Sequence, residues 1–219
     1  MSSRRLAWAI GVLVMGSSAA GTDAVVSQEC ADKVRDVART SEALLQIATG
    51  NQPRQSDASS VPQGAITADD VLRSPKRRVR VLPRRLRDLP SAGFRRSTTF
   101  GRLLVALQGR DVIVHVHESP YPLEVRGAQL VMGKRVGHFR FVRVQIGNRP
   151  VGDDLIALLG HELFHALEIA HSPEVMSHAG LGQLFRRIGF RTAQDGHFDS
   201  DGARAVERWI RLELSGVCR

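Results

Sequence analysis

Residues 153–170 are the segment that most limits how this chain can fold. Their apolar side chains recur at helical spacings, no proline interrupts them, and Gly160 is the only weak helix former. Asp153 or Asp154 can cap the start, and Pro173 cannot continue the helix beyond its end. The pattern therefore predicts one long, mostly buried helix.

Two histidines one helical turn apart lie on this predicted helix. His161 and His165 occupy positions i and i+4 of one helix face, so both imidazoles can point at a single metal ion. Glu162 follows one step round the helix and can reach a water molecule beside that ion. Zn²⁺ held by two histidines and a third protein ligand keeps an open position and lowers the pKa of its water towards neutrality. The spacing thus predicts zinc ligands at both histidines and a general base at Glu162.

The segment 161–171 reads HELFHALEIAH and resembles the zincin metallopeptidases. His171 falls at the spacing of the third histidine in the metzincin motif HExxHxxGxxH, so the resemblance implies that His171 completes the zinc site. Met176 lies in what looks like a shortened metzincin methionine turn. The chain has Glu168 where that family has glycine. Glycine at this position lets the helix end in a left-handed conformation, so that the following chain can bring the third histidine back to the metal.

Three carboxylates are alternatives to His171 as the third ligand. If the helix runs on to His171, that residue lies about 15 Å along the axis from the first histidine and cannot share its metal. Glu168 lies on the ligand face, although it is better placed to accept the free N–H of an imidazole. Glu174 follows the helix, and Asp199 opens the last helical segment, where it resembles the carboxylate supplied by a second helix in gluzincin-like and aspzincin-like enzymes.

The N-terminal segment predicts export. Arg4 and Arg5 precede an apolar run at 6–15 and small residues at 16–21, which is typical of a secretory signal peptide, here assigned to 1–22. That run is too short to span a bilayer comfortably, and no later segment approaches the ~20 apolar residues of a spanning helix. A secreted or periplasmic location is oxidising, so Cys30 and Cys218, the only cysteines, are expected to form a disulfide.

Beyond the leader, the sequence predicts a helix at 23–50, a polar linker at 51–65 and one catalytic domain at 66–219. In that domain a helix over 97–107, capped by Ser97 or Thr98, should precede strands at 111–117, 128–132 and 138–146, with a turn at 133–137. The expected fold class is α+β: a small sheet of about three to four strands backing the HExxH helix, with flanking helices. This order resembles a minimal zincin scaffold, a family in which an edge strand pairs with the extended substrate.

The formal net charge of +9 includes a dense basic run between Lys76 and Arg87. Apolar residues interleave with its arginines and no aromatic stacking residues accompany them, so we expect a solvated strand-and-turn face. At most a weak contact with an anionic surface is expected there, and no nucleic acid is expected as a partner. His115 and His117 alternate to one face of a strand and are expected to be polar-face residues; His138, His178 and His197 are expected at the surface or in loops.

The sequence therefore predicts a secreted, zinc-dependent metallopeptidase that acts on a peptide or protein substrate without a stable membrane span. One alternative is an exported, non-catalytic binding or structural protein that retains the metal-site helix. Another is a basic module that binds anionic surfaces. The metal content of the purified protein separates the metallopeptidase from the two alternatives. Salt-sensitive binding to anionic polymers would favour the basic module.

Overall fold

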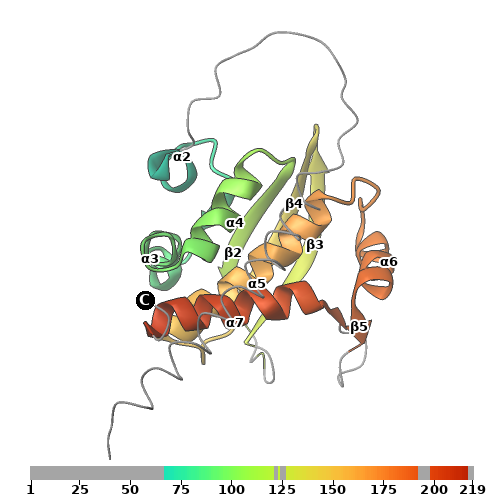
Figure 1. Ribbon diagram of the computed structural model, residues 1–219. Helices are drawn as coiled ribbons and strands as arrows, with labels where there is room; N and C mark the ends of the chain where they lie inside the picture. Colours follow the sequence, from blue (N-terminus) through green and yellow to red (C-terminus); the bar gives the residue numbers. More distant parts are fainter. Residues whose placement is uncertain (1–66, 121–122, 124–126, 192–197, 217–219) are drawn as a thin grey trace, which may run out of the picture.

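The computed structural model describes residues 67–120, 123, 127–191 and 198–216 (Figure 1). The expected signal peptide, the helix at 23–50, the linker, His197, Cys30 and Cys218 all lie outside these residues. Within the described part, the buried apolar side chains of the sheet and the long helices form one shared core.

A four-stranded mixed sheet is the centre of the fold. Its strand order is β1 (Val79–Val81), β2 (Val112–Glu118), β4 (Phe139–Ile146) and β3 (Ala128–Val136). β1, β2 and β4 run parallel, while β3 pairs antiparallel with β4 and forms one edge of the sheet. The α+β class with a small sheet is confirmed. The turn expected at 133–137 is wrong, because β3 continues to Val136 through an irregularity in register after Met132.

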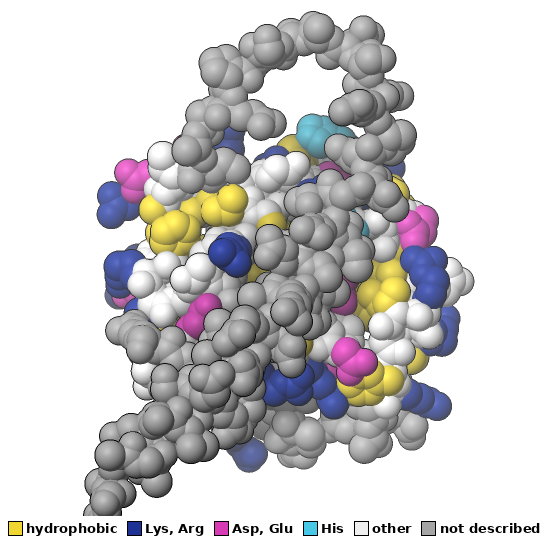
Figure 2. Space-filling model, viewed as in Figure 1, with side chains coloured by type: hydrophobic (Ala, Val, Ile, Leu, Met, Phe, Trp, Pro, Cys, Tyr) yellow, Lys and Arg dark blue, Asp and Glu magenta, His cyan; other side chains and the backbone are white. Residues whose placement is uncertain are grey.

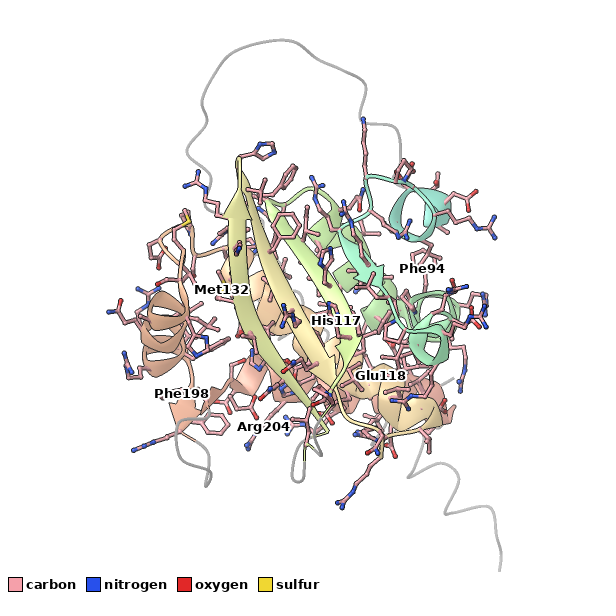
Figure 3. All side chains as sticks on the ribbon, turned by 180° about the vertical axis from the view of Figure 1, so that it is seen from behind. Phe94, His117, Glu118, Met132, Phe198 and Arg204 are labelled. Carbon is pink, nitrogen blue, oxygen red and sulfur yellow. The ribbon has the colours of Figure 1, made fainter. Side chains whose placement is uncertain are left out.

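Helices cover one face of the sheet. α4 (Thr98–Gln108) and α5 (Gly152–Ala170) lie across it, and α7 (Asp201–Ser215) packs along α5 (Figure 1). Val112, Val114 and Val116 of β2 are buried in the core beneath these helices. His115 and His117 alternate with them and are only partly buried, and Figure 3 shows His117 on the face turned away from the helices.

Shorter elements surround this layer. α2 (Ala68–Leu72) and α3 (Leu89–Arg96) adjoin α4, and the 3₁₀ turn η1 (Arg84–Leu86) follows β1. α6 (His178–Ile188) lies beside β3, and the short pair β5 (Phe190–Arg191) and β6 (Phe198–Asp199) leads into α7. No helix among the described residues combines the length and apolar character needed to cross a bilayer.

The expected helix caps are partly right. Ser97 caps α4 by accepting a hydrogen bond from the backbone N–H of Phe100. At the start of α5, however, the N-cap is Val151, which provides no side-chain cap. Asp153 and Asp154 instead form ion pairs with Arg96 and Arg211. These two acidic side chains therefore link the first turn of α5 to α3 and α7.

Two glycines allow α5 and α7 to approach closely. A Cβ on Gly160 would lie 2.1 Å from Cδ1 of Ile210, and one on Gly202 would lie 2.5 Å from Cε1 of Phe164. Neither distance is compatible with a side chain unless the partner moves. Gly160, the weak helix former of the sequence pattern, thus brings α7 against the helix next to His161.

Arg140 holds the C-terminal end of α5 to the sheet. It is 1% exposed, and its guanidinium makes a two-point contact of 2.8 Å and 2.8 Å with the carboxylate of Asp111. Nη1 also donates to the carbonyls of Ile169 and Ser172, at 2.9 Å and 2.7 Å. These carbonyls lie at and just beyond the helix end, where they also accept from the backbone N–H groups of Ser172 and Val175 in place of i+4 helical donors. A buried cation there is also favoured by the helix dipole.

The basic run is largely tied to the fold. Arg78 donates to the Arg110 carbonyl at 2.7 Å and lies over the Phe139 ring, and Arg85 pairs with Glu118 at 2.7 Å. Leu86, in the same run, is fully buried. Figure 2 shows Lys and Arg side chains spread around the visible face instead of gathered in one patch. The segment is a strand followed by a 3₁₀ turn, as expected in outline; Lys76, Arg84 and Arg87 are exposed, whereas Arg78 and Arg85 are held by neighbouring groups.

Candidate metal centre

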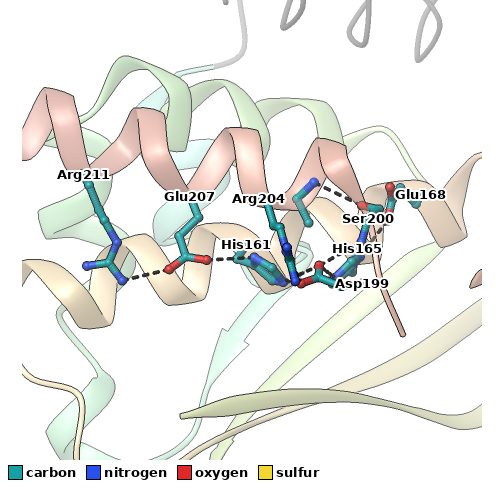
Figure 4. A network of polar contacts seen from close by, with 9 residues as sticks. His161, His165, Glu168, Asp199, Ser200, Arg204, Glu207 and Arg211 are labelled. Carbon is teal, nitrogen blue, oxygen red and sulfur yellow. Dashed lines mark hydrogen bonds and ion pairs between the residues drawn. The ribbon is translucent and has the colours of Figure 1, made fainter. Parts of the chain in front are cut away.

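Two segments far apart in the sequence meet at this centre. His161 and His165 lie on the buried face of α5, while Asp199 ends β6 immediately before α7 (Figure 4). Ser200 caps α7 by accepting from the N–H of Ala203 at 3.1 Å, and its own N–H donates to Oδ1 of Asp199 at 2.8 Å. The cap thus fixes the direction of the carboxylate as the chain enters α7.

The three side chains present their ligand atoms to one another. The two Nε2 atoms of His161 and His165 are 3.1 Å apart. Oδ1 of Asp199 lies 3.3 Å from Nε2 of His161 and 3.5 Å from Nε2 of His165. All three residues are buried, and together they form a group that can bind a metal ion.

Each imidazole also contacts a second carboxylate through its other nitrogen. Nδ1 of His165 is 2.7 Å from Oε2 of Glu168, and Nδ1 of His161 is 3.0 Å from Oε2 of Glu207 on α7. The His161 contact has ion-pair distance without the alignment of a hydrogen bond. A carboxylate only accepts, so both contacts favour the tautomer with the proton on Nδ1.

This tautomer leaves the two Nε2 lone pairs facing each other. At 3.1 Å, with no proton between them, two lone pairs repel, and the nearby Asp199 oxygen adds further negative charge. The arrangement is stabilised by a positive charge at the shared point, supplied either by a proton or by a metal ion. The donor set therefore fits a cation of the kind that binds nitrogen and oxygen ligands.

Without a metal ion, the surrounding carboxylates favour a proton at this point. Burial disfavours the charged form of His161, but contacts with Asp199 and Glu207 and the nearby charge of Glu162 outweigh it and raise the pKa of His161 to about 10. The pKa of His165 is also raised, because Asp199 and Glu168 outweigh its burial. Burial likewise opposes ionisation of Asp199, yet the two histidines and Arg204 hold its pKa below the usual range.

Arginines of α7 balance the remaining carboxylates. Nε of Arg204 donates to Oδ2 of Asp199 at 2.9 Å, leaving Oδ1 to face the histidines. Arg211 pairs with Glu207 at 2.8 Å and also contacts Asp154. Figure 4 shows this chain of contacts along α7 and α5. The centre is thus held by charge pairs on both sides of the histidines.

The third residue of this group is Asp199, not His171. The helix has no break at Glu168 and continues to Ala170, where His171 is its C-cap. His171 consequently lies about 15 Å along the axis from His161, beside a different cavity that it shares with Leu167 and Ile188. Asp199, one of the alternatives, lies on the short strand before α7 and is brought back by the α5–α7 packing.

The other candidates lie outside the three-residue group. Glu168 accepts from His165, the contact expected of it. Glu174 is exposed and pairs with Arg187 at 2.8 Å. His115 and His117 lie on the opposite face of the sheet, where burial and neighbouring arginines lower their pKa values.

Sequence reasoning did not identify Glu207 or Arg204. The available signal was their spacing: both lie on α7 at positions that share a face, and Arg204 is five residues after Asp199. That spacing becomes informative only after α7 is known to pack along α5, which depends on the small residues Gly160 and Gly202.

Glu162 lines two cavities beside the centre. One has a volume of about 680 Å³ and is bounded by α5, α7 and the loop at Arg149. The other has a volume of about 620 Å³ and is bounded by the edge strand β3 and by α6. His161 and Glu162 line both cavities. A bound peptide that extends from one cavity into the other would therefore pass these two side chains.

No protein-family model matches the chain, and neither the curated proteins nor the solved structures compared with it contain a significant match.

Proposed function

We propose that this chain is an exported, zinc-dependent metallopeptidase with His161, His165 and Asp199 as ligands and Glu162 as general base. The observation that carries the proposal is the spacing of the donor atoms. Ligand atoms held about 2.0–2.1 Å from a tetrahedral zinc ion lie about 3.3 Å from one another. The corresponding distances here are 3.1, 3.3 and 3.5 Å. The fourth position of such a site would remain open to water or substrate.

The surrounding side chains support zinc over harder ions. Mg²⁺ and Ca²⁺ prefer oxygen ligands, whereas two imidazoles and one carboxylate are typical of catalytic zinc. Glu168 and Glu207 contact the outer nitrogens of the two histidines, which orients the rings and increases their basicity. Both outer contacts come from helices of the core, so the donor atoms are held before any ion arrives.

When bound, the ion would supply Lewis acidity, polarising a water molecule and the carbonyl of the scissile amide. Glu162 follows His161 directly in α5 and is 5% exposed. Its carboxylate lines both cavities, where it can accept a proton from the attacking water and deliver it to the leaving amine. Asp199 takes no part in this proton transfer, because His161, His165 and Arg204 hold its carboxylate ionised.

The edge strand offers a means of holding an extended substrate. β3 is paired only with β4 in the described sheet, and residues Ala128–Val131 line the second cavity next to Glu162. An extended peptide can add to such an edge through main-chain hydrogen bonds. We therefore expect peptide or protein substrates, delivered outside the cytoplasm if residues 1–22 act as a signal peptide.

The decisive comparison is between the parent protein and Glu162→Gln, both loaded with zinc. Glu162→Gln should retain the metal and the fold but lower hydrolysis of a peptide library by about 10²-fold or more, the scale of a lost general base. His165→Ala should lose the zinc. Equal cleavage by the parent and Glu162→Gln would remove Glu162 from the mechanism. A zinc-loaded parent that cleaves nothing in a broad library would favour the non-catalytic binding protein instead.

A further inference from the structure

The two cavities beside the metal centre differ in chemistry. The second cavity is bounded by β3 and α6. The apolar side chains Leu130, Val131, Leu181 and Phe185 line it together with polar ones, among them Gln129, Gln183 and the exposed Arg186. Apart from Glu162, no carboxylate appears among its described lining residues. Eight charged residues line the first cavity, and half of them come from one face of α7.

Four charged residues of α7 form this face: Arg204, Glu207, Arg208 and Arg211. Their spacing of i, i+3, i+4 and i+7 places them on one side of the helix, and all four line the first cavity. Arg204 and Arg211 are engaged with carboxylates of the site, and Glu207 contacts both Arg211 and His161. Within the described part of the chain, Arg208 is the residue of this face whose guanidinium is not engaged by a carboxylate.

A second available arginine lies across the same cavity. Arg149 belongs to the loop between β4 and α5, and both Arg149 and Arg208 are exposed. Neither guanidinium forms a hydrogen bond or ion pair with another residue in the described part of the chain. Among the described residues, this side of the metal centre therefore carries two guanidinium groups that no internal pair engages.

We propose that the enzyme selects peptides that carry a carboxylate on one side of the scissile bond and an apolar side chain on the other. Arg149 and Arg208 bind the carboxylate in the first cavity, and the apolar side chain enters the second. Guanidinium groups suit this task because their planar N–H pairs match the two oxygens of a carboxylate. The carboxylate is either an Asp or Glu side chain or the C-terminus of the peptide. This inference rests on the proposed peptidase function.

The first test measures binding and does not depend on turnover. Full-length, zinc-loaded Glu162→Gln is titrated with peptides in which leucine neighbours either glutamate or glutamine, made in both residue orders. In one order, the glutamate peptide should bind roughly fivefold more tightly than its glutamine counterpart, the scale of a partly exposed ion pair. The ratio of the two affinities should fall towards one when Arg208→Ala or Arg149→Ala is added.

Arg102→Ala is the matched control, because Arg102 is an exposed arginine of α4 that lines neither cavity. The preference should persist in that background. Peptides ending in a free carboxylate or in an amide separate the two sources: a preference confined to the free acid assigns the site to a chain terminus. Equal affinity for the glutamate and glutamine peptides overturns the proposal, as does a preference that survives both arginine substitutions, or the absence of binding by either peptide.

Cleavage by the parent protein distinguishes this inference from the proposed function. Zinc-dependent cleavage that depends on Glu162 but shows no preference for acidic peptides leaves the peptidase assignment intact and removes the specificity proposal. Carboxylate-dependent binding without any cleavage would support the binding preference and count against the peptidase assignment. Arg208→Glu adds a further check, because reversing this charge should shift the preference towards a lysine at the same substrate position.

Discussion

Nδ1 of His165 donates a hydrogen bond to Oε2 of Glu168, which lies 2.7 Å away and three residues further along α5. This contact fixes the proton on Nδ1 and leaves the Nε2 lone pair directed at His161 and Asp199. Glu168 stands at the position where the metzincin motif has glycine. The helix continues past Glu168, which carries His171 away from the site, and the same glutamate orients the imidazole of His165.

Glu168→Ala should therefore lower zinc affinity by about 10–100-fold while leaving the ligand atoms in place. The loss comes from a ring that is less basic and free to rotate. Competition with a chromophoric chelator measures the affinity. Glu174→Ala is the control, since Glu174 is an exposed carboxylate paired with Arg187 and should not affect the metal. Equal affinities in Glu168→Ala and the parent would show that the contact does not tune the site.

A second prediction concerns the identity of the third ligand. Asp199→Ala should weaken zinc binding by more than the about 10–100-fold expected for loss of an outer partner. His171→Ala should retain one zinc per chain with parent affinity, because the continuous helix carries His171 away from the other histidines. Metal analysis and chelator competition on the two variants decide the matter. Loss of zinc in His171→Ala alone would instead identify His171 as the third ligand.

Local pattern was sufficient to predict much of the fold. The apolar spacing of 153–170 predicted α5, and the β-branched runs predicted β2 and the paired strands β3 and β4. Ser97 was predicted as a cap because its chemistry acts within one turn. The cap of α5 was wrong for the opposite reason: Asp153 and Asp154 pair with arginines from α3 and α7, and sequence spacing cannot show such partners.

The same limit applies to the centre itself. His161, Glu162 and His165 lie within one turn of a helix, so their spacing alone brought them together. Asp199 could only be one of several alternatives, because its position depends on how α7 packs against α5. The residue types of β4 also give no sign of the buried position of Arg140. This arginine lies on the covered face because the carbonyls at the end of α5 and Asp111 bind its guanidinium.

Arg140→Met should consequently destabilise the protein by about 3 kcal/mol or more, the scale of breaking a buried ion pair. Methionine fills much of the volume, but the carbonyls of Ile169 and Ser172 lose their buried donor. Denaturant unfolding of the metal-free protein measures the change in the free energy of unfolding. Arg143→Met, on the exposed face of the same strand, should change stability by less than about 0.5 kcal/mol. Similar losses in the two variants would contradict the structural role of Arg140.

The protonated centre predicts opposite pH responses for stability and for metal binding. In the metal-free protein the pKa of His161 is raised to about 10: burial opposes its charge, but Asp199, Glu207 and Glu162 outweigh that effect. The folded state therefore holds a proton that the unfolded chain releases near pH 6.5. This contribution to stability is fully present below that pH and is lost as the pH rises towards about 10. The lowered pKa of Asp199 contributes in the other direction, with stability lost as acid protonates its carboxylate.

Between pH 6.5 and 8.5, the free energy of unfolding of the metal-free protein should fall by up to about 1.4 kcal/mol per pH unit. Over the same range, apparent zinc affinity should rise about tenfold per pH unit for each proton that the ion displaces. Glu207→Gln removes one of the contacts that stabilise the His161 imidazolium, so both slopes should become shallower. Glu174→Gln makes the same chemical change at an exposed site and should leave both slopes unaltered. Denaturant unfolding and chelator competition at three pH values test this, and pH-independent zinc affinity in the parent would show that protons do not occupy the ligand nitrogens.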